Sequence, residues 1–207
     1  RTVLKELKAV CGAAEADDAV RAVVLTGAGQ TFSSGFDLKE QAADPPQGVK
    51  EWEPVLKHDF DGVMLFWHLS NPTIAAVRGH VLAGAFEMML ACDMTVAAEG
   101  SMFGEPELKF GAGIVVMLAP WYVSPKIAKE IILMGDDQIP AERALDLGFV
   151  NEIVPKGEEV NMAIRRARHL ARMDPMILRR TKAAINRSYE TMGLLQALDM
   201  ALDMDLL

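Results

Sequence analysis

Cysteine is scarce in this chain of 207 residues: Cys11 and Cys92 are its only two, and no Cys-x-x-Cys pair occurs. Isolated cysteines exclude a disulfide framework and favour a reducing compartment, so we expect a cytoplasmic protein. Cys92 is predicted to be a small, buried residue of the core. The sequence also lacks any apolar run of about 18 residues or more, which argues against a transmembrane helix and against a membrane partner.

Positive charge is in the minority, because 21 Lys and Arg face 29 Asp and Glu for a formal net charge of −8. An acidic chain is not a general nucleic-acid binder, so we expect no nucleic-acid partner. One segment departs from this balance and carries eight cations against the single acid Asp174: Arg165, Arg166, Arg168, Arg172, Arg179, Arg180, Lys182 and Arg187. It is either a solvated helical face or a surface that attracts an anionic ligand.

The most informative stretch runs from Asn71 to Gly111. Residues 74–77 form a short apolar run that predicts a buried strand, and a helix is expected to start near Gly84. Glu87 is the one charged residue of this apolar helix. A carboxylate in such a helix is expected to have a raised pKa, which suits a general acid or base near neutral pH.

A second glutamate, Glu107, follows the predicted strand 94–98 within Gly104-Glu105-Pro106-Glu107. Two carboxylates from different elements make a plausible acid/base pair. The alternatives are a solvated helical glutamate and an ordinary loop charge. His58 and His68 have no partner at metal-ligand spacing, so we expect no metal site. The glycines of segment 27–35 fit neither dinucleotide-binding nor phosphate-binding loops.

Other segments are assigned from apolar periodicity and turn residues. Helices are predicted at residues 1–14, 51–69, 126–134, 140–148, 161–172 and 175–192, and strands or extended pieces at 21–26 and 149–154. Residues 78–80 are expected to form a turn.

Three blocks of sequence resemble the crotonase superfamily, the enoyl-CoA hydratases and isomerases. They are residues 23–39 (VVLTGAGQTFSSGFDLK), residues 80–111 with Cys92-Asp93, Phe103 and Pro106-Glu107, and residues 141–155. The resemblance implies an α/β fold, a spiral of repeated ββα units with a C-terminal helical trimerisation region. We expect the spiral core at residues 1–135 and the helical region at 136–207. Family members also have a β-hairpin before the first helix and a further helix after the equivalent of Leu207.

The resemblance also implies roles for individual residues. Glu87 and Glu107 would be catalytic, and the backbone N–H groups of Phe36 and Gly84 would form an oxyanion hole for the thioester oxygen. A helix N-terminus at Gly84 suits that role because its N–H groups have no partner within the helix. Further substrate contacts are implied for Gly35, Asp37, Leu38, Ala83, Gly111 and Val115.

The function implied is hydration of an unsaturated acyl-CoA thioester by a homotrimer or hexamer, with no cofactor apart from the coenzyme A of the substrate. The alternatives are a Δ3,Δ2-enoyl-CoA isomerase, a hydrolase of a cyclic oxo-acyl-CoA, and a non-catalytic CoA-thioester or RNA binder. The chain departs from the family at Ile114-Val115-Val116-Met117, where paired glycines usually start a helix beside the substrate. We therefore expect an altered acyl preference, unless these side chains turn into the core.

Overall fold

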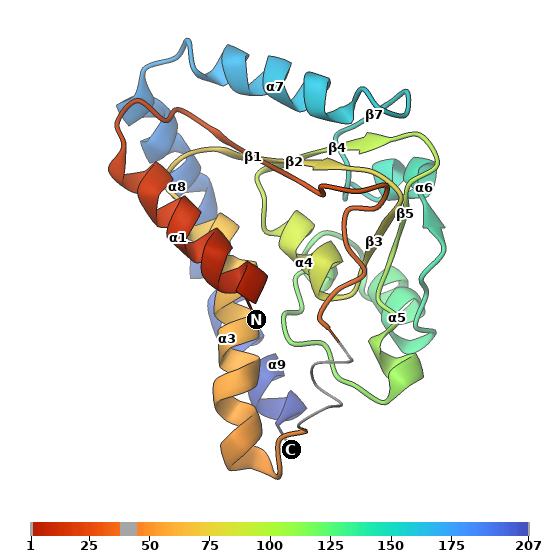
Figure 1. The fold of residues 1–207 in the computed structure, drawn as a ribbon. Helices are drawn as coiled ribbons and strands as arrows, with labels where there is room; N and C mark the ends of the chain where they lie inside the picture. Colours follow the sequence, from red (N-terminus) through yellow and green to blue (C-terminus); the bar gives the residue numbers. More distant parts are fainter. Residues whose placement is uncertain (1, 38–44, 207) are drawn as a thin grey trace.

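The computed structural model describes residues 2–37 and 45–206, and a parallel sheet lies at its centre (Figure 1). The order of its four strands is β1 (Val23–Thr26), β2 (Thr73–Val77), β4 (Met94–Ala98) and β7 (Glu152–Val154). β2 is buried along its whole length, as expected for a strand with neighbours on both edges and covered faces. The sequence predicted all four as strands or extended pieces.

A second, smaller sheet contains β3 (His80–Leu82), β5 (Met102–Gly104) and β6 (Ile139–Pro140). β3 and β5 are parallel, and Leu82 pairs with Gly104. The chain passes from β2 in the first sheet to β3 in the second, and again from β4 to β5. The turn predicted at residues 78–80 is wrong in part, because His80 already belongs to β3. Strands of three residues are too short for a period of two to be recognised.

The two faces of the central sheet pack against different helices. α7 (Glu159–Leu170) lies along one face (Figure 1), where Ile74 and Ala76 of β2 contact Ala163. The alternate residues, Ala75 and Val77, enter the main core on the other face. That core includes α4 (Gly84–Leu90), which is buried at six of its seven positions.

The remaining helices surround this core. α1 (Thr2–Ala16) and α3 (Val49–His68) lie side by side (Figure 1), and Leu4 of α1 packs over Gly62 of α3. The others are short turns η1 and η2 and helices α5, α6, α8 and α9, with the bounds Glu107–Phe110, Ala119–Trp121, Pro125–Leu133, Ala141–Asp146, Pro175–Thr191 and Leu194–Asp205. Residues 112–118, which include the segment where the chain departs from the family pattern, are irregular.

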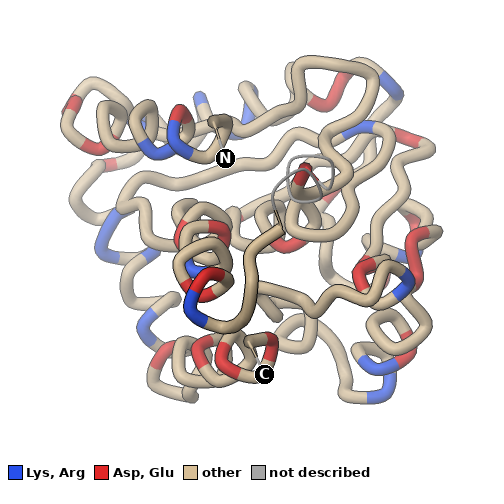
Figure 2. Tube along the Cα trace, turned by 60° about the horizontal axis from the view of Figure 1, so that its bottom comes forward, with Lys and Arg blue, Asp and Glu red and all other residues tan. Residues whose placement is uncertain are grey.

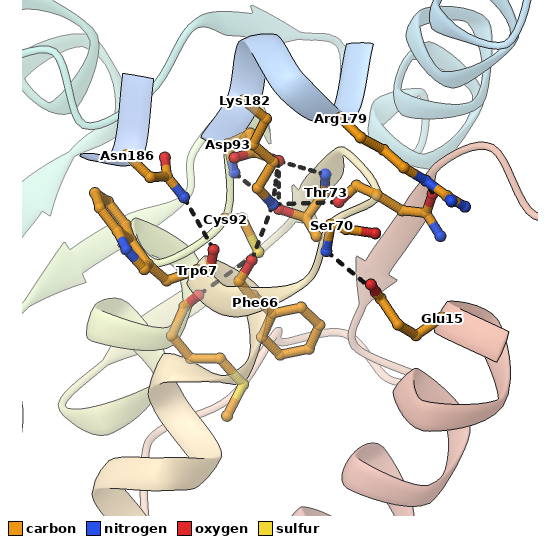
Figure 3. Close-up of polar contacts among 12 residues, drawn as sticks. Glu15, Phe66, Trp67, Ser70, Thr73, Cys92, Asp93, Arg179, Lys182 and Asn186 are labelled. Carbon is orange, nitrogen blue, oxygen red and sulfur yellow. Dashed lines mark hydrogen bonds and ion pairs between the residues drawn. The ribbon is translucent and has the colours of Figure 1, made fainter. Parts of the chain in front are cut away.

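α8 is attached to the sheet by the side chain of Lys182, which is 8% exposed (Figure 3). Its Nζ lies 2.8 Å from Asp93 Oδ2 and donates to the carbonyl oxygens of Phe66 and Asn71. The same Asp93 oxygen accepts from the N–H and the hydroxyl of Thr73 at the start of β2. Because a buried ammonium is costly without partners, these contacts fix the position of α8.

No helix within the described residues is long and apolar enough to cross a membrane. Cys11 and Cys92 are free and buried, as predicted for Cys92. Burial raises the pKa of the Cys92 thiol, which leaves it unreactive near neutral pH.

Candidate active site

Three chain segments end together at the start of α4. The segment around Ser33 forms a parallel bridge with Val81 of β3, and β3 pairs in parallel with β5. Parallel neighbours deliver their carboxyl ends to one edge, where ligands of α/β proteins commonly bind. The residues that follow these ends are Phe36, Gly84 and Glu105, so the topology explains why they meet.

Phe36 and Gly84 come into contact at this edge. A Cβ atom on Gly84 would lie 2.5 Å from the Phe36 ring, and one on Gly35 would lie 3.5 Å from the backbone nitrogen of Gly84. Neither the Phe36 N–H nor the Gly84 N–H donates to another residue within the described ranges. Backbone N–H groups without a protein partner are free to donate to an anionic oxygen of a ligand.

Ala83, between β3 and α4, has φ 58° and ψ −142°, and it is the only non-glycine with positive φ among the described residues. That conformation is normally restricted to glycine and costs roughly 1–3 kcal/mol elsewhere. The Ala83 N–H donates to Gly104 O at 2.9 Å, which helps to hold the turn. Strain of this kind is concentrated at functional sites, and here it sets the direction of the Gly84 N–H.

Glu87 lies one helical turn into α4 and is fully buried. Its carboxylate accepts from the backbone N–H of Leu118 at 2.7 Å and of Ala119 at 3.2 Å. Burial raises its pKa to about 7, although these N–H groups and the neighbouring Glu105 act in the opposite direction. The prediction of a buried glutamate with a raised pKa is confirmed.

Glu105 is also fully buried, directly after β5. Its carboxyl group is in hydrogen-bonding contact with both Glu87 and Glu107, so it lies between the two predicted catalytic residues. Burial and the charges of both neighbours hold its pKa well above the usual range of a glutamate. We refer to Glu87, Glu105 and Glu107 as the carboxyl cluster.

Glu107 starts the short turn η1 and lines a cavity of about 430 Å³, here called the Glu107 cavity. Burial raises its pKa, while contact with Glu105 lowers it. Most of the cavity wall is apolar or aromatic. The residues that form it are Ser34, Phe36, Trp52, Leu56, Ala83, Pro106, Glu107, Phe110, Gly111, Ala112, Gly113, Val115, Asp205 and Leu206. Glu87 and Glu105 are absent from this wall, because both are buried behind it.

The predicted substrate-binding residues divide between two cavities. Ala83, Gly111 and Val115 line the Glu107 cavity, whereas Gly35, Asp37 and Gly84 line a neighbouring one of about 440 Å³. Phe36 belongs to both walls. Leu38 lies outside the described residues.

Sequence reasoning missed Glu105 and Asp205. Glu105 stands two residues before Glu107 in the sequence, but its place at the end of β5 is known only from the structure. Asp205 comes from α9, nearly a hundred residues further along the chain, and its carboxylate occupies the space that a side chain on Gly113 would need. Nothing local in the sequence indicates that contact.

The basic run does not form one cationic surface, and Figure 2 shows acidic and basic residues interspersed over the molecule. Four of its members pair with carboxylates: Arg166 with Glu152, Arg179 with Asp18, Lys182 with Asp93 and Arg187 with Glu190. Within residues 2–37 and 45–206, no group of three or more His, Cys, Asp or Glu is arranged to hold a metal ion.

Known proteins resemble this chain in sequence. The profile of the family described as enoyl-CoA hydratase/isomerase matches residues 1–205. A putative enoyl-CoA hydratase of Mycobacterium tuberculosis is 33% identical over 96% of this chain and 69% of its own length. One of Thermus thermophilus is 38% identical over 81% of this chain and 67% of its own length.

Solved structures extend the likeness to the fold. The crystal structure of an enoyl-CoA hydratase/isomerase from Xanthobacter autotrophicus Py2 superposes with a TM-score of 0.97 at 59% identity, covering 98% of this chain and 76% of that one. A probable enoyl-CoA hydratase from Mycobacterium thermoresistibile gives 0.90 at 28% identity, covering 99% and 84%. The predicted crotonase-type α/β fold is thereby confirmed, as is the predicted relationship to CoA-thioester enzymes.

Proposed function

Since the chain belongs to the enoyl-CoA hydratase/isomerase family, we propose that it hydrates the α,β double bond of an unsaturated acyl-CoA thioester. One observation carries the proposal: Glu107 faces an apolar cavity whose wall also contains Phe36, and Phe36 is shared with the neighbouring cavity that Gly84 lines. The carboxylate and the two backbone N–H donors therefore belong to two adjoining cavities that meet at Phe36. The reaction needs no cofactor apart from the coenzyme A of the substrate.

The two N–H groups act on the thioester oxygen. When water adds to the β-carbon, negative charge moves to this oxygen and an enolate forms. The N–H groups of Phe36 and Gly84 donate to that oxygen, and Gly84 adds the positive end of a helix. Each donor of this type is typically worth about 3–4 kcal/mol in the transition state.

Glu107 and Glu87 together act as the general base and the general acid. One carboxylate takes a proton from water, whose oxygen adds to the β-carbon, and the α-carbon receives a proton from the same pair of residues. Burial raises the pKa of both groups, to about 7 for Glu87, and a raised pKa makes a carboxylate a stronger base toward water. We assign the two roles jointly to the pair.

The test incubates the protein with crotonyl-, octenoyl-, cyclohexenecarbonyl- or cinnamoyl-CoA. Hydration is measured as the loss of the conjugated-enone absorbance. Glu87→Gln and Glu107→Gln should each lower kcat by at least about 10²-fold and leave CoA-ester binding nearly unchanged. Glu99→Gln, at an exposed position, is the control and should keep wild-type kcat. Near-wild-type turnover in either test variant removes that residue from the mechanism.

A second candidate is a Δ3,Δ2-enoyl-CoA isomerase, which needs one carboxylate to carry a proton between two carbons. It is favoured by the complete burial of Glu87, because Glu107 is the one member of the carboxyl cluster that lines the cavity. A 3-enoyl-CoA separates the two functions. An isomerase turns it into the conjugated 2-enoyl-CoA and stops there, whereas a hydratase acts on the conjugated compound itself.

We propose that the acyl group is large and apolar. Of the four bulky residues at 114–117, Val115 lines the cavity, while Ile114 and Val116 are buried elsewhere. Aromatic side chains of Phe36, Trp52 and Phe110 complete the wall. A methylene group in such a pocket is worth only about 1–3 kcal/mol, so the preference is graded. Octenoyl- or cinnamoyl-CoA should exceed crotonyl-CoA in kcat/KM, and the reverse order would contradict this assignment.

We also propose self-association as a trimer or a dimer of trimers. Ile177 and Ile185 of α8 are 67% and 55% exposed, and a helix with such an apolar face is commonly covered by another subunit. Leu194 and Leu198 of α9, by contrast, pack into this chain's own core. Light scattering at micromolar concentration should give three or six subunits, and a monomer would refute the proposal.

A further inference from the structure

Glu105 presents an electrostatic problem in a site that already holds two glutamates. Its side chain is fully buried, and when all three groups of the carboxyl cluster are ionised, neither of its oxygens meets a hydrogen-bond donor among the described residues. Glu107 Oε2 likewise meets no hydrogen-bond donor among the described residues. Yet Glu105 contacts both Glu87 and Glu107. Carboxylates in contact repel each other unless a proton lies between them.

The distribution of donors shows which group holds that proton. Glu87 accepts from the N–H groups of Leu118 and Ala119, which stabilise its ionised form. Glu107 faces the cavity, where water can solvate its charge. Glu105 has neither backbone donors nor solvent within the described structure. Of the three carboxyl groups it therefore loses least by becoming neutral.

We propose, building on the proposed function, that Glu105 is a positioning residue that stays protonated and donates its O–H to Glu87 or Glu107. Glu107 is thereby kept ionised and turned toward the cavity. The direction of the pKa of Glu105, well above its usual range through burial and the charges of its neighbours, agrees with this arrangement.

One O–H can donate to a single carboxylate at a time, so the proton of Glu105 connects the two catalytic residues. When the O–H of Glu105 donates to Glu107, Glu107 becomes a weaker base. When the O–H donates to Glu87 instead, Glu107 remains the stronger base. Glu105 neither gains nor loses a proton over the catalytic cycle. The atoms of water and substrate balance without it, which distinguishes a positioning residue from a catalytic one.

Two substitutions separate hydrogen-bond donation from packing. Glu105→Gln places N–H donors at the same point without an ionisable proton, and kcat should stay within about 10-fold of wild type. Glu105→Leu keeps the side-chain size but offers no donor. It should lower kcat by at least about 10²-fold and change KM less than about 3-fold. Wild-type kcat in Glu105→Leu, or equal losses in both variants, would overturn the proposal.

A measurement without substrate decides the protonation state directly. The infrared spectrum of the wild-type protein at about pH 9, where Glu87 with its pKa of about 7 is ionised, should contain the C=O stretching band of a buried, protonated carboxylic acid, and Glu105→Gln should lose it. The exposed control Glu99→Gln should retain the band. A band that persists in Glu105→Gln places the proton on another residue and refutes the proposal. A chain that shows the band but hydrates none of the four thioesters refutes the proposed function alone.

Discussion

The ring of Phe36 occupies the space that a side chain on Gly84 would need, with ring atoms 2.5 Å and 2.7 Å from the position of a Cβ atom. Gly84→Ala should therefore displace either the ring or the start of α4 and separate the two N–H donors. We expect kcat to fall by about 10²-fold, the usual effect of losing one oxyanion donor, with an unchanged circular dichroism spectrum.

The control for this change is Gly29→Ala, at an exposed position with open space around its Cβ, which should leave kcat unaltered. Adding Phe36→Ala to Gly84→Ala removes the clash while retaining the N–H of residue 36. The double variant should recover part of the lost kcat. A Gly84→Ala enzyme as active as wild type would show that the Gly84 N–H does not contact the thioester.

The strained turn at Ala83 predicts an effect on stability. Ala83→Gly removes the Cβ from a backbone conformation that favours glycine. The strain energy that is released exceeds the extra conformational entropy that glycine loses on folding. We expect the free energy of unfolding in urea to rise by about 1 kcal/mol. Ala85→Gly, two residues later inside α4, should instead lower it by about 1 kcal/mol. A decrease in both variants would mean that Ala83 is not strained.

The raised pKa of Glu87 predicts how stability depends on pH. Between its unfolded value of 4.5 and its folded value of about 7, the folded chain keeps a proton that the unfolded chain releases. The stabilisation from this proton is present at acid pH and is lost as the pH rises through about 7. Across that interval the free energy of unfolding of the wild-type protein should fall by up to roughly 1.4 kcal/mol per pH unit because of Glu87. This contribution to the slope should be missing in Glu87→Gln. Chemical denaturation from pH 5 upward measures it, and parallel curves for the two proteins would contradict it.

The ion pair between buried Lys182 and the more exposed Asp93 predicts a clear effect of one charge (Figure 3). Lys182→Met removes the contacts of this ammonium with Asp93 and with two carbonyl oxygens, and should lower the free energy of unfolding by about 2 kcal/mol. Lys57→Met removes a comparable charge from an exposed pair with Asp61, and a change within about 0.5 kcal/mol is expected. Equal effects in thermal or urea unfolding would show that α8 is held in place by other contacts.

The sequence was sufficient for Glu87 because a helix that is apolar nearly all round has no polar face on which a glutamate could be solvated. It also predicted the central strands and the site at the start of α4 from apolar runs and from family motifs. β3 and β5 were too short to show a periodic pattern. The irregular path of residues 112–118 and the approach of Asp205 depend on contacts between distant segments, which no local pattern records. Glu105 needed the pairing of β3 with β5 before its position between two glutamates became visible.

Incubation of an octenoyl- or cinnamoyl-CoA with the protein in heavy-oxygen water, followed by mass spectrometry, tests hydration most directly. We predict a hydroxyacyl-CoA product that carries one heavy oxygen atom, formed by the wild-type protein and by Glu99→Gln but at least about 10²-fold more slowly by Glu107→Gln. A product that shifts its double bond without taking up heavy oxygen, or equal rates with Glu107→Gln, would contradict the central claim that Glu107 directs water onto an unsaturated acyl-CoA.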